Sequence, residues 1–326
     1  MKLSNDAIQC PICGFEENKI LHNVVFDKKH QIIKCLKCTN IFLSPRLTGG
    51  EIYGENYYYF NNYPAKAVKQ DNLKSDFILN FIKQKFPQAN SVFDVGAAAG
   101  IFLNKARKSG YKINGLEISK TGCKIAETVF GVKLYCGGIE DFFLNKKIEA
   151  DIVVMTDVLE HSNNPESALK IIHSAMETGS RIIIETPNIN SFYHKLIGKH
   201  WVGFNKYHNF YFSKDSLIKL SSDAGFKILL VFTTNFNLLS GEGLWRLGIK
   251  DCLKSALLKT RIIANKDSKK NFERDMDFNE ISRRLNNDYE TGFDLKKKIS
   301  DWINFPLNFF FNKNLLGDQI WIILEK

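Results

Sequence analysis

The chain has 326 residues, which is too long for one minimal domain and suits one large domain with attachments. Its hydrophobic content of 44% is ordinary for a globular protein, and the absence of any apolar run of roughly 18 residues excludes a predicted membrane-spanning helix. The formal net charge of +10 comes from 45 basic and 35 acidic residues that are interspersed, so charge alone predicts no nucleic-acid partner.

Two pairs of cysteines stand near the N-terminus, Cys10 with Cys13 and Cys35 with Cys38. Two residues separate the members of each pair, so the pairs can supply four thiolates to one tetrahedral zinc ion. A closed four-thiolate site has no open coordination position, and we therefore expect a structural zinc ribbon over residues 1–48. The cysteine pattern favours a reducing compartment, and no hydrophobic signal opens the chain, so a cytoplasmic location is expected.

Residues 49–90 are predicted to form a linker and a cap helix. The helix is expected from Pro64 to Phe86, because apolar residues recur there at helical spacing. A tyrosine-rich patch that includes Tyr57 and Tyr58 precedes it.

Residues 91–326 are predicted to form an α/β domain. Strand-like apolar runs are expected at 91–95, 111–117, 133–136, 151–156, 181–185, 226–232 and 319–324. Helices are expected between them at 101–108, 120–129, 165–176 and 214–224. Strands that alternate with helices pair in parallel, so the fold class is a Rossmann-like, seven-stranded, mostly parallel sheet with flanking helices. The last two strands lie too far apart for a plain connection, which predicts a helical insertion at about 240–313.

The insertion carries the pattern of a basic amphipathic helix. Trp245, Ile249 and Cys252 recur at helical spacing, and Arg246 and Lys250 form a basic stripe beside them. Such a helix can lie on an anionic membrane surface, which would give a peripheral membrane contact. A helical cap over the sheet or a dimer contact is the alternative, and the sequence leaves the oligomeric state open.

The first strand of the α/β domain leads into a turn that contains Gly96 and Gly100, and a helix follows at once. Glycines in such a turn let a ligand approach the backbone closely. One strand later, Glu117 places a carboxylate where it can accept hydrogen bonds from two ribose hydroxyls. The two glycines alone are an ambiguous nucleotide loop, and the acid on the second strand favours an adenosine cofactor.

Several segments together resemble the class I S-adenosylmethionine-dependent methyltransferases. Residues 92–100 resemble the first motif of that family, and residues 138–142 resemble the segment that packs against the adenine. The run 151–161, which ends in Leu-Glu-His, resembles the fourth strand and its end. The closest likeness is to the branch of ubiquinone and sugar methyltransferases, and a subgroup with an N-terminal zinc ribbon shares the segment 42–48. One departure is Ala98, which replaces the middle glycine of the first motif.

The resemblance implies a set of contacts with S-adenosylmethionine. The residues it assigns to the cofactor are Asp94, Gly96, Ala98, Gly100, Glu117, Ile118, Ile139, Glu140, Asp157 and Tyr58. Tyr58 has a second interpretation, in which the tyrosines form an aromatic clasp between the ribbon and the core. The turn glycines and Glu117 also have simpler interpretations, as a tight strand–helix turn and a solvated acid at a strand end.

Methyl transfer to a hydroxyl needs alignment of the acceptor, exclusion of water and removal of a proton. His161 and His208 are the candidate catalytic bases, because both follow strands at the edge where open α/β sheets bind ligands. Alternatively, His161 orients its loop and His208 packs within its own. No metal is required for this reaction, and the sequence shows no metal cluster apart from the four cysteines.

The resemblance favours a small-molecule or glycan acceptor, with O-methylation of a sugar in a cell-surface polysaccharide or a secondary metabolite as the leading hypothesis. A quinone precursor or a deoxysugar nucleotide is an alternative acceptor. From a different class, a zinc-ribbon nucleic-acid-binding protein with a degenerate methyltransferase fold would also explain the ribbon and the net charge of +10.

Overall fold

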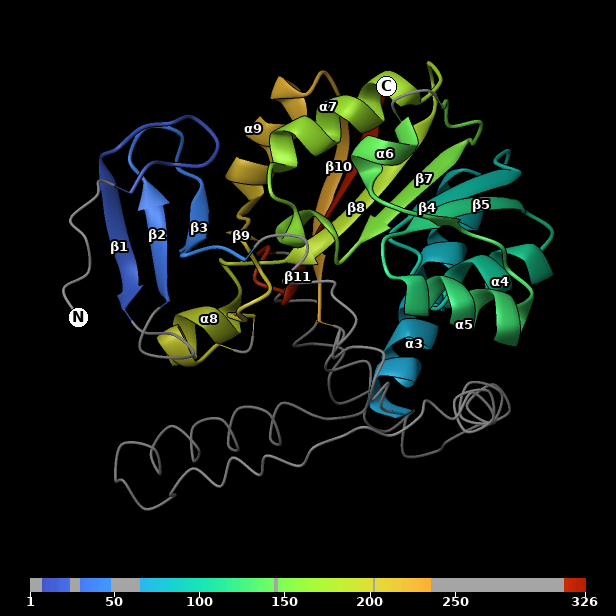
Figure 1. Ribbon diagram of the computed structural model, residues 1–326, viewed down its shortest axis with the longest axis horizontal. Helices are drawn as coiled ribbons and strands as arrows, with labels where there is room; N and C mark the ends of the chain where they lie inside the picture. Colours follow the sequence, from blue (N-terminus) through green and yellow to red (C-terminus); the bar gives the residue numbers. More distant parts are fainter. Residues whose placement is uncertain (1–7, 24–29, 48–64, 144–145, 202, 236–313) are drawn as a thin grey trace.

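The computed structural model describes residues 8–23, 30–47, 65–143, 146–201, 203–235 and 314–326 (Figure 1). Tyr57, Tyr58 and the predicted insertion at 240–313 lie outside the described residues. Within the described part, no helix combines the length and the apolar character needed to cross a membrane.

A seven-stranded sheet forms the centre of the molecule, with the strand order β10-β11-β8-β7-β4-β5-β6. The five strands from β8 to β6 pair in parallel, and β11 is antiparallel to both of its neighbours. The strands are β4 (Ser91–Val95), β5 (Lys112–Glu117), β6 (Tyr135–Cys136), β7 (Ile152–Thr156), β8 (Arg181–Pro187), β10 (Lys227–Thr234) and β11 (Gln319–Glu325). The predicted α/β fold with a mostly parallel seven-stranded sheet is confirmed.

Helices cover both faces of this sheet (Figure 1). One face carries α3 (Ala65–Lys85), α4 (Ile101–Lys108) and α5 (Lys120–Phe130), and the other carries α6 (Ile139–Phe143), α7 (Pro165–Ala175) and α9 (Lys214–Asp223). Shorter elements connect them: α8 (Phe192–Ile197) and the 3-10 turns η1 (Leu159–His161) and η2 (Gly198–His200).

Side chains that alternate along each central strand supply a hydrophobic core on each face. In β7, Val153 and Met155 join the core beneath α7 and α9, whereas Ile152 and Val154 join the core beneath α3 and α4. Burial on both faces explains why the run reads as continuously apolar. The sequence also determines where the next helix, α7, begins. Asn164 caps its N-terminus by accepting a hydrogen bond from the Ser167 amide at 3.0 Å.

The N-terminal ribbon forms a second sheet with the order β1-β2-β3-β9. Its own strands are β1 (Asn18–Asn23), β2 (Gln31–Cys35) and β3 (Ile41–Ser44). The fourth strand, β9 (Phe210–Tyr211), comes from the segment directly after His208 and pairs antiparallel with β3. The ribbon is therefore joined by main-chain hydrogen bonds to the segment that carries His208, one of the two candidate catalytic bases.

A disulfide joins Cys123, in the first turn of α5, to Cys136 at the end of β6, with their Cα atoms 6.1 Å apart. The sequence predicted reduced thiols, because the chain has seven cysteines, an odd number, and four of them fall in metal-binding pairs. This prediction is wrong for Cys123 and Cys136. The strand order decides this contact, since it brings the end of β6 beside the end of β5, and α5 begins just after β5.

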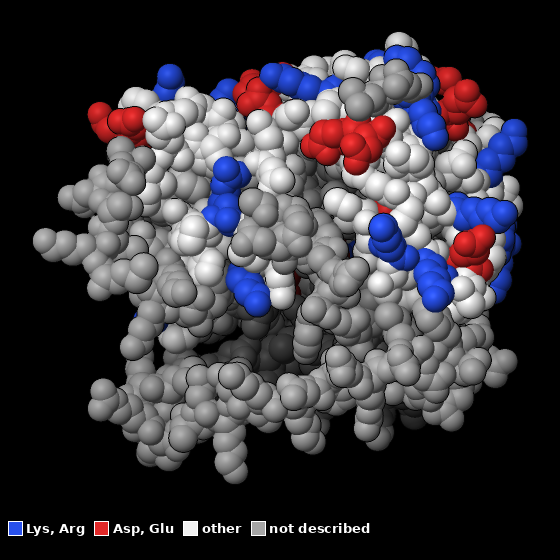
Figure 2. All heavy atoms as spheres, in the orientation of Figure 1, with Lys and Arg blue, Asp and Glu red and all other residues white. Residues whose placement is uncertain are grey.

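Basic and acidic side chains are interspersed over the described part of the face shown in Figure 2. This agrees with the mixed charge pattern along the sequence.

Candidate functional site

The described residues enclose a cavity of about 910 Å³ at the C-terminal edge of the parallel strands. Open α/β sheets bind their ligands at this edge, because the connections that follow the strands diverge there. The cavity has two halves. The loop half comprises the turn at 94–99, Glu117, Ile118 and residues 137–140. The histidine half comprises Lys74, Asp157, Val158, residues 161–163 and residues 204–208.

The backbone conformation requires the two glycines of the turn that follows β4, Gly96 and Gly100. Gly96 has a φ of 81°, and a Cβ there would lie 2.4 Å from Val158 Cγ2. Gly100 has a φ of 76°, and a Cβ there would lie 2.9 Å from the Cβ of Ala126. Gly96 lines the cavity, whereas Gly100 is buried behind the turn. Gly100 thus shapes the turn, and its predicted contact with a cofactor stays a prediction.

Ala98 adopts the left-handed conformation that its glycine counterpart would adopt freely, with a φ of 47°. Its amide donates to Glu117 Oε2 at 2.8 Å, and the amide of Ser119 donates to Glu117 Oε1 at 2.7 Å. The carboxylate of Glu117 therefore fastens the glycine turn to the end of β5. Each carboxylate oxygen can accept a second hydrogen bond, so Glu117 can hold the turn and bind two hydroxyls at once.

Asp94 and Glu117 are both buried in the loop half. Burial, together with the charge of Glu117, raises the pKa of Asp94 to about 8. Burial also raises the pKa of Glu117, although the amides of Ser119 and Ala98 partly oppose this. Two acids that resist ionisation in this way favour a cationic ligand, because a nearby positive charge stabilises their ionised forms.

The remaining predicted cofactor residues converge on the same cavity. Ile118 lines it although 42% of its surface is exposed, and Ile139 and Glu140 line it from the start of α6. An exposed apolar side chain beside the acid of β5 can pack against a flat ring. Asp157 lines the histidine half of the cavity, and Tyr58 lies outside the described residues.

The two predicted histidines lie together in the histidine half, with ring centroids 4.8 Å apart. The Nδ1 atom of His161 lies 2.7 Å from the carbonyl oxygen of Tyr207, and that of His208 lies 3.0 Å from the carbonyl oxygen of Gly203. A carbonyl only accepts, so each neutral ring carries its proton on Nδ1. Each Nε2 is then left with a lone pair that can accept a proton.

Burial keeps both rings neutral. It lowers the pKa of His161, against the opposing effects of the Tyr207 carbonyl and Asp157. Burial, with the nearby His161, lowers the pKa of His208 to about 3. Both imidazoles are therefore neutral near neutral pH, and the low pKa of His208 makes it the weaker base of the two, so His161 is the better proton acceptor.

Lys74 of α3 forms ion pairs with two acids at the histidine half, and nothing in the sequence singles it out. Lys74 Nζ forms ion pairs with Asp157 and, at 2.8 Å, with Glu185, whose side chain is fully buried. Burial raises the pKa of Glu185 to about 7, and Asp157 adds to this, while Lys74 opposes it. Burial would lower the pKa of Lys74, but the two carboxylates outweigh burial and raise it. One helical lysine gives no signal in sequence, because only the tertiary structure buries it.

Glu160 is a second buried acid, after Glu185, and it lies next to His161 behind the cavity lining. Its Oε2 accepts a hydrogen bond from the Thr186 hydroxyl at 3.0 Å, and its Oε1 is buried with no partner among the described residues. Burial, with the charges of Asp157 and Glu185, raises its pKa well above the usual value. One atom each from Glu160, His161 and His208 lies within 4.8 Å of the others, so these groups are also close enough to hold a metal ion. This cluster could not be predicted from the sequence, because His208 lies far along the chain from Glu160 and His161.

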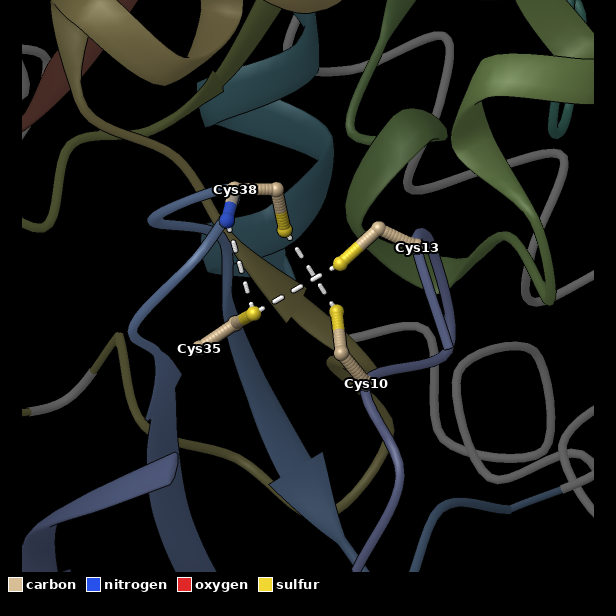
Figure 3. Close-up of side chains that lie close together, drawn as sticks. All are labelled: Cys10, Cys13, Cys35 and Cys38. Carbon is tan, nitrogen blue, oxygen red and sulfur yellow. Dashed lines mark hydrogen bonds between the residues drawn. The ribbon is translucent and has the colours of Figure 1, made fainter. Parts of the chain in front are cut away.

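The four cysteines of the ribbon converge as predicted (Figure 3). The Sγ atoms of Cys10 and Cys38 lie 3.5 Å apart, and those of Cys13 and Cys35 lie 3.6 Å apart. Four sulfurs at about 2.3 Å from one zinc ion would be separated by about 3.8 Å, so the cluster fits a tetrahedral site. The amide of Cys38 also points at Cys35 Sγ at 3.5 Å, which stabilises a thiolate there.

Comparison with known proteins places this geometry in a family. Residues 68–231 match the family described as "Methyltransferase domain". The ubiquinone biosynthesis O-methyltransferase of Coxiella burnetii is 22% identical over 194 residues, which is 55% of this chain and 82% of that relative. The enzyme of the same name from Chromobacterium violaceum is 26% identical over 105 residues, 31% of this chain and 45% of that relative. The chain thus spans about half the length of some curated relatives that it matches.

Solved structures with a similar chain path include two S-adenosylmethionine-dependent methyltransferases. One from Archaeoglobus fulgidus has a TM-score of 0.46 and 17% identity, and the match covers 83% of this chain and all of that chain. One from Thermotoga maritima, described as a possible histamine N-methyltransferase, has a TM-score of 0.41 and 23% identity, with 55% of this chain and 79% of that chain covered.

Proposed function

Because this chain belongs to the S-adenosylmethionine-dependent methyltransferases, we propose that it O-methylates a small-molecule or glycan acceptor held between the two halves of the cavity. The observation that carries the proposal is the pair of neutral imidazoles, His161 and His208. Each ring is held by Nδ1 on a backbone carbonyl, and both rings line the same cavity as Glu117.

The loop half fits the cofactor. Glu117 would bind the ribose hydroxyls, and Ile118 and Ile139 would pack against the adenine. The buried acid pair of Asp94 and Glu117 suits a ligand that carries positive charge. When bound, S-adenosylmethionine supplies a methyl group that is activated by its sulfonium.

The histidine half would handle the acceptor. The Nε2 atom of His161 accepts the proton of the acceptor hydroxyl as its oxygen becomes the nucleophile. Asp157 favours the imidazolium that results, since its charge raises the pKa of His161. His208 packs edge-on against His161 and fixes the direction of that ring.

A hydroxyl acceptor agrees with the names of the curated relatives, which are ubiquinone biosynthesis O-methyltransferases. Within this class we keep a sugar of a cell-surface polysaccharide or secondary metabolite as the leading acceptor. A phenolic quinone precursor is the alternative that the relatives favour. Each has a hydroxyl whose proton must leave.

The proposal includes a structural zinc ion on Cys10, Cys13, Cys35 and Cys38, since their sulfur spacing fits a tetrahedral site. The cytoplasmic location stays a prediction, because four metal-bound thiolates favour a reducing compartment and the disulfide between Cys123 and Cys136 does not. A peripheral membrane contact through 240–313 stays a prediction, because that segment lies outside the described residues.

Transfer of a labelled methyl group from S-adenosylmethionine tests the proposal. The acceptor panel contains catechols, nucleotide sugars and polysaccharide. We expect His161→Ala to lower kcat by roughly 10²- to 10⁴-fold with the best acceptor, while calorimetry finds binding of S-adenosylhomocysteine unchanged. Lack of S-adenosylhomocysteine binding, together with salt-sensitive binding to nucleic acid, would contradict the proposal and support the nucleic-acid alternative.

A divalent cation distinguishes a base from a metal site in the histidine half. If His161 is the base, added Mg²⁺ or Mn²⁺ leaves the rate unchanged. A rate that depends on the added cation, and that is lost equally in His161→Ala and Glu160→Gln, would reassign these residues as metal ligands.

A further inference from the structure

Asn209 lies where the ribbon, β9 and the loop after β7 meet. It directly follows His208 in the chain, and its side chain is fully buried. A buried amide side chain must satisfy one acceptor and two donor hydrogens, so its partners define its role.

The side chain of Asn209 bonds to the ribbon and to the His161 loop at the same time. Its Oδ1 accepts from the amide of Leu47 at 3.2 Å, and its Nδ2 donates to the carbonyl of Leu47 at 3.0 Å. The same Nδ2 donates to the carbonyl of His161 at 3.4 Å. Both donor hydrogens of the amide group and one lone pair of its oxygen are thereby used.

The main chain of Asn209 also bonds both to the loop that carries His161 and to the ribbon. Its amide donates to the carbonyl of Glu160 at 2.8 Å, and its carbonyl accepts from the amide of Leu43 in β3 at 3.0 Å. Arg46 adds a contact nearby, since its guanidinium donates to the carbonyl of Asn163 at 2.7 Å and lies over the ring of Phe210. The ribbon thus contacts both the loop that carries His161 and the segment that carries His208.

We propose that Asn209 is a positioning residue that couples the zinc ribbon to the two histidines of the acceptor site. The inference rests on the proposed function, because it assigns the histidine half to the acceptor. Asn209 fixes the last described residue of the ribbon against the carbonyl of His161, so the folded ribbon sets the direction of the His161 ring. The loop half has no bond to Asn209 among the contacts described, and its ligand affinity is independent of this coupling.

Nuclear magnetic resonance of ¹⁵N-labelled histidine rings tests the coupling without any acceptor. In the wild-type protein, His161 and His208 give the signals of single Nδ1–H tautomers. In Asn209→Ala, His161 becomes a mixture of the two tautomers, whereas zinc content stays at one ion per chain and calorimetry finds S-adenosylhomocysteine affinity within about two-fold of wild type.

Asp151→Ala is the matched control. Its Oδ2 accepts three hydrogen bonds, from Asn90 and Ser91, at the edge of the sheet opposite to the cavity. We expect this variant to lose stability and to keep the wild-type tautomers. Arg46→Ala is a second test variant at an exposed position, and it shifts His161 in the same direction by a smaller amount.

The results separate the inference from the function it rests on. Wild-type tautomers in folded Asn209→Ala, or equal tautomer changes in Asp151→Ala, would overturn the coupling. If Asn209→Ala does not fold, wild-type tautomers in Arg46→Ala would overturn it. Full methyl transfer by His161→Ala would instead overturn the proposed base and leave the ring spectra as a valid test of Asn209.

Discussion

The loop half and the histidine half of the cavity are built in different ways. The loop half takes its residues from one stretch of chain, 94–140, in which consecutive strand ends lie side by side. The histidine half takes Lys74 from α3, Asp157 and His161 from the segment after β7, and His208 from the segment joined to the ribbon. The half proposed for the common methyl donor is local in sequence. The half proposed for the particular acceptor depends on distant contacts.

The halves also differ in how they keep buried acids. Glu117 is held by backbone amides, which are fixed by the turn itself. The fully buried Glu185 instead has its charge paired by a side chain, Lys74, which also pairs with the partly exposed Asp157. Removal of Lys74 from the histidine half should therefore lower the free energy of unfolding. Removal of Glu117 from the loop half should instead lower the affinity for the ligand.

The largest expected effect is that of Lys74→Met. This change leaves Glu185 buried without its cation, and we expect the free energy of unfolding at neutral pH to fall by about 3–5 kcal/mol in urea titrations. The double variant Lys74→Met/Glu185→Gln removes the orphaned charge and should regain most of that loss. If the free energy of unfolding of Lys74→Met fell by less than about 1 kcal/mol, the Lys74 ion pair would not stabilise the histidine half as proposed.

Next is Glu117→Ala in the loop half. The change removes the acceptor of two backbone amides and of the ribose hydroxyls, so affinity for S-adenosylhomocysteine should fall roughly 100-fold by calorimetry. Glu127→Ala, at an exposed position on α5, is the control and should bind normally. Comparable affinities in the two variants would remove the ribose assignment.

The pH dependence of stability gives a smaller effect. The pKa of Asp94 is raised to about 8 from 3.8, so the folded state holds a proton that the unfolded state has lost. The contribution of Asp94 is therefore complete below about pH 4 and is lost as the pH rises through about 8. Between about pH 6 and pH 8, wild-type stability should fall by roughly 1–2 kcal/mol more than that of Asp94→Asn, measured by thermal unfolding. Parallel curves for the two proteins would contradict the raised pKa.

The smallest expected effect is that of Ala98→Gly. Glycine relieves the left-handed strain at this position, at a cost in unfolded-chain entropy, so a net gain of at most about 1 kcal/mol is expected. The same change at Ala106, inside α4, serves as the control and should destabilise the protein by about 1 kcal/mol. A destabilised Ala98→Gly protein would mean that the methyl group of Ala98 makes contacts that outweigh its strain.

The sequence predicted the central sheet and its helices well, because the central strands β4, β7 and β8 are apolar on both faces and α5, α7 and α9 each begin at a capping side chain. Glu117, Ile118 and Ile139 line one cavity, since strand ends in a parallel sheet share an edge, and their contact with a cofactor stays a prediction. Lys74, Glu185 and Asn209 gave no signal of their own. Polar residues of these types are usually solvated, and only burial gives them a role.

The amino-acid sequence by itself determined the parallel sheet, the glycine turn with its acid, and the four-cysteine ribbon, because hydrophobic period and residue spacing act over short stretches of chain. Only the tertiary structure decided that β9 completes the sheet of the ribbon, that Lys74 reaches two buried carboxylates, and that His161 and His208 meet. These contacts join segments far apart in the chain. Packing of the whole domain selects them, and no local pattern encodes them.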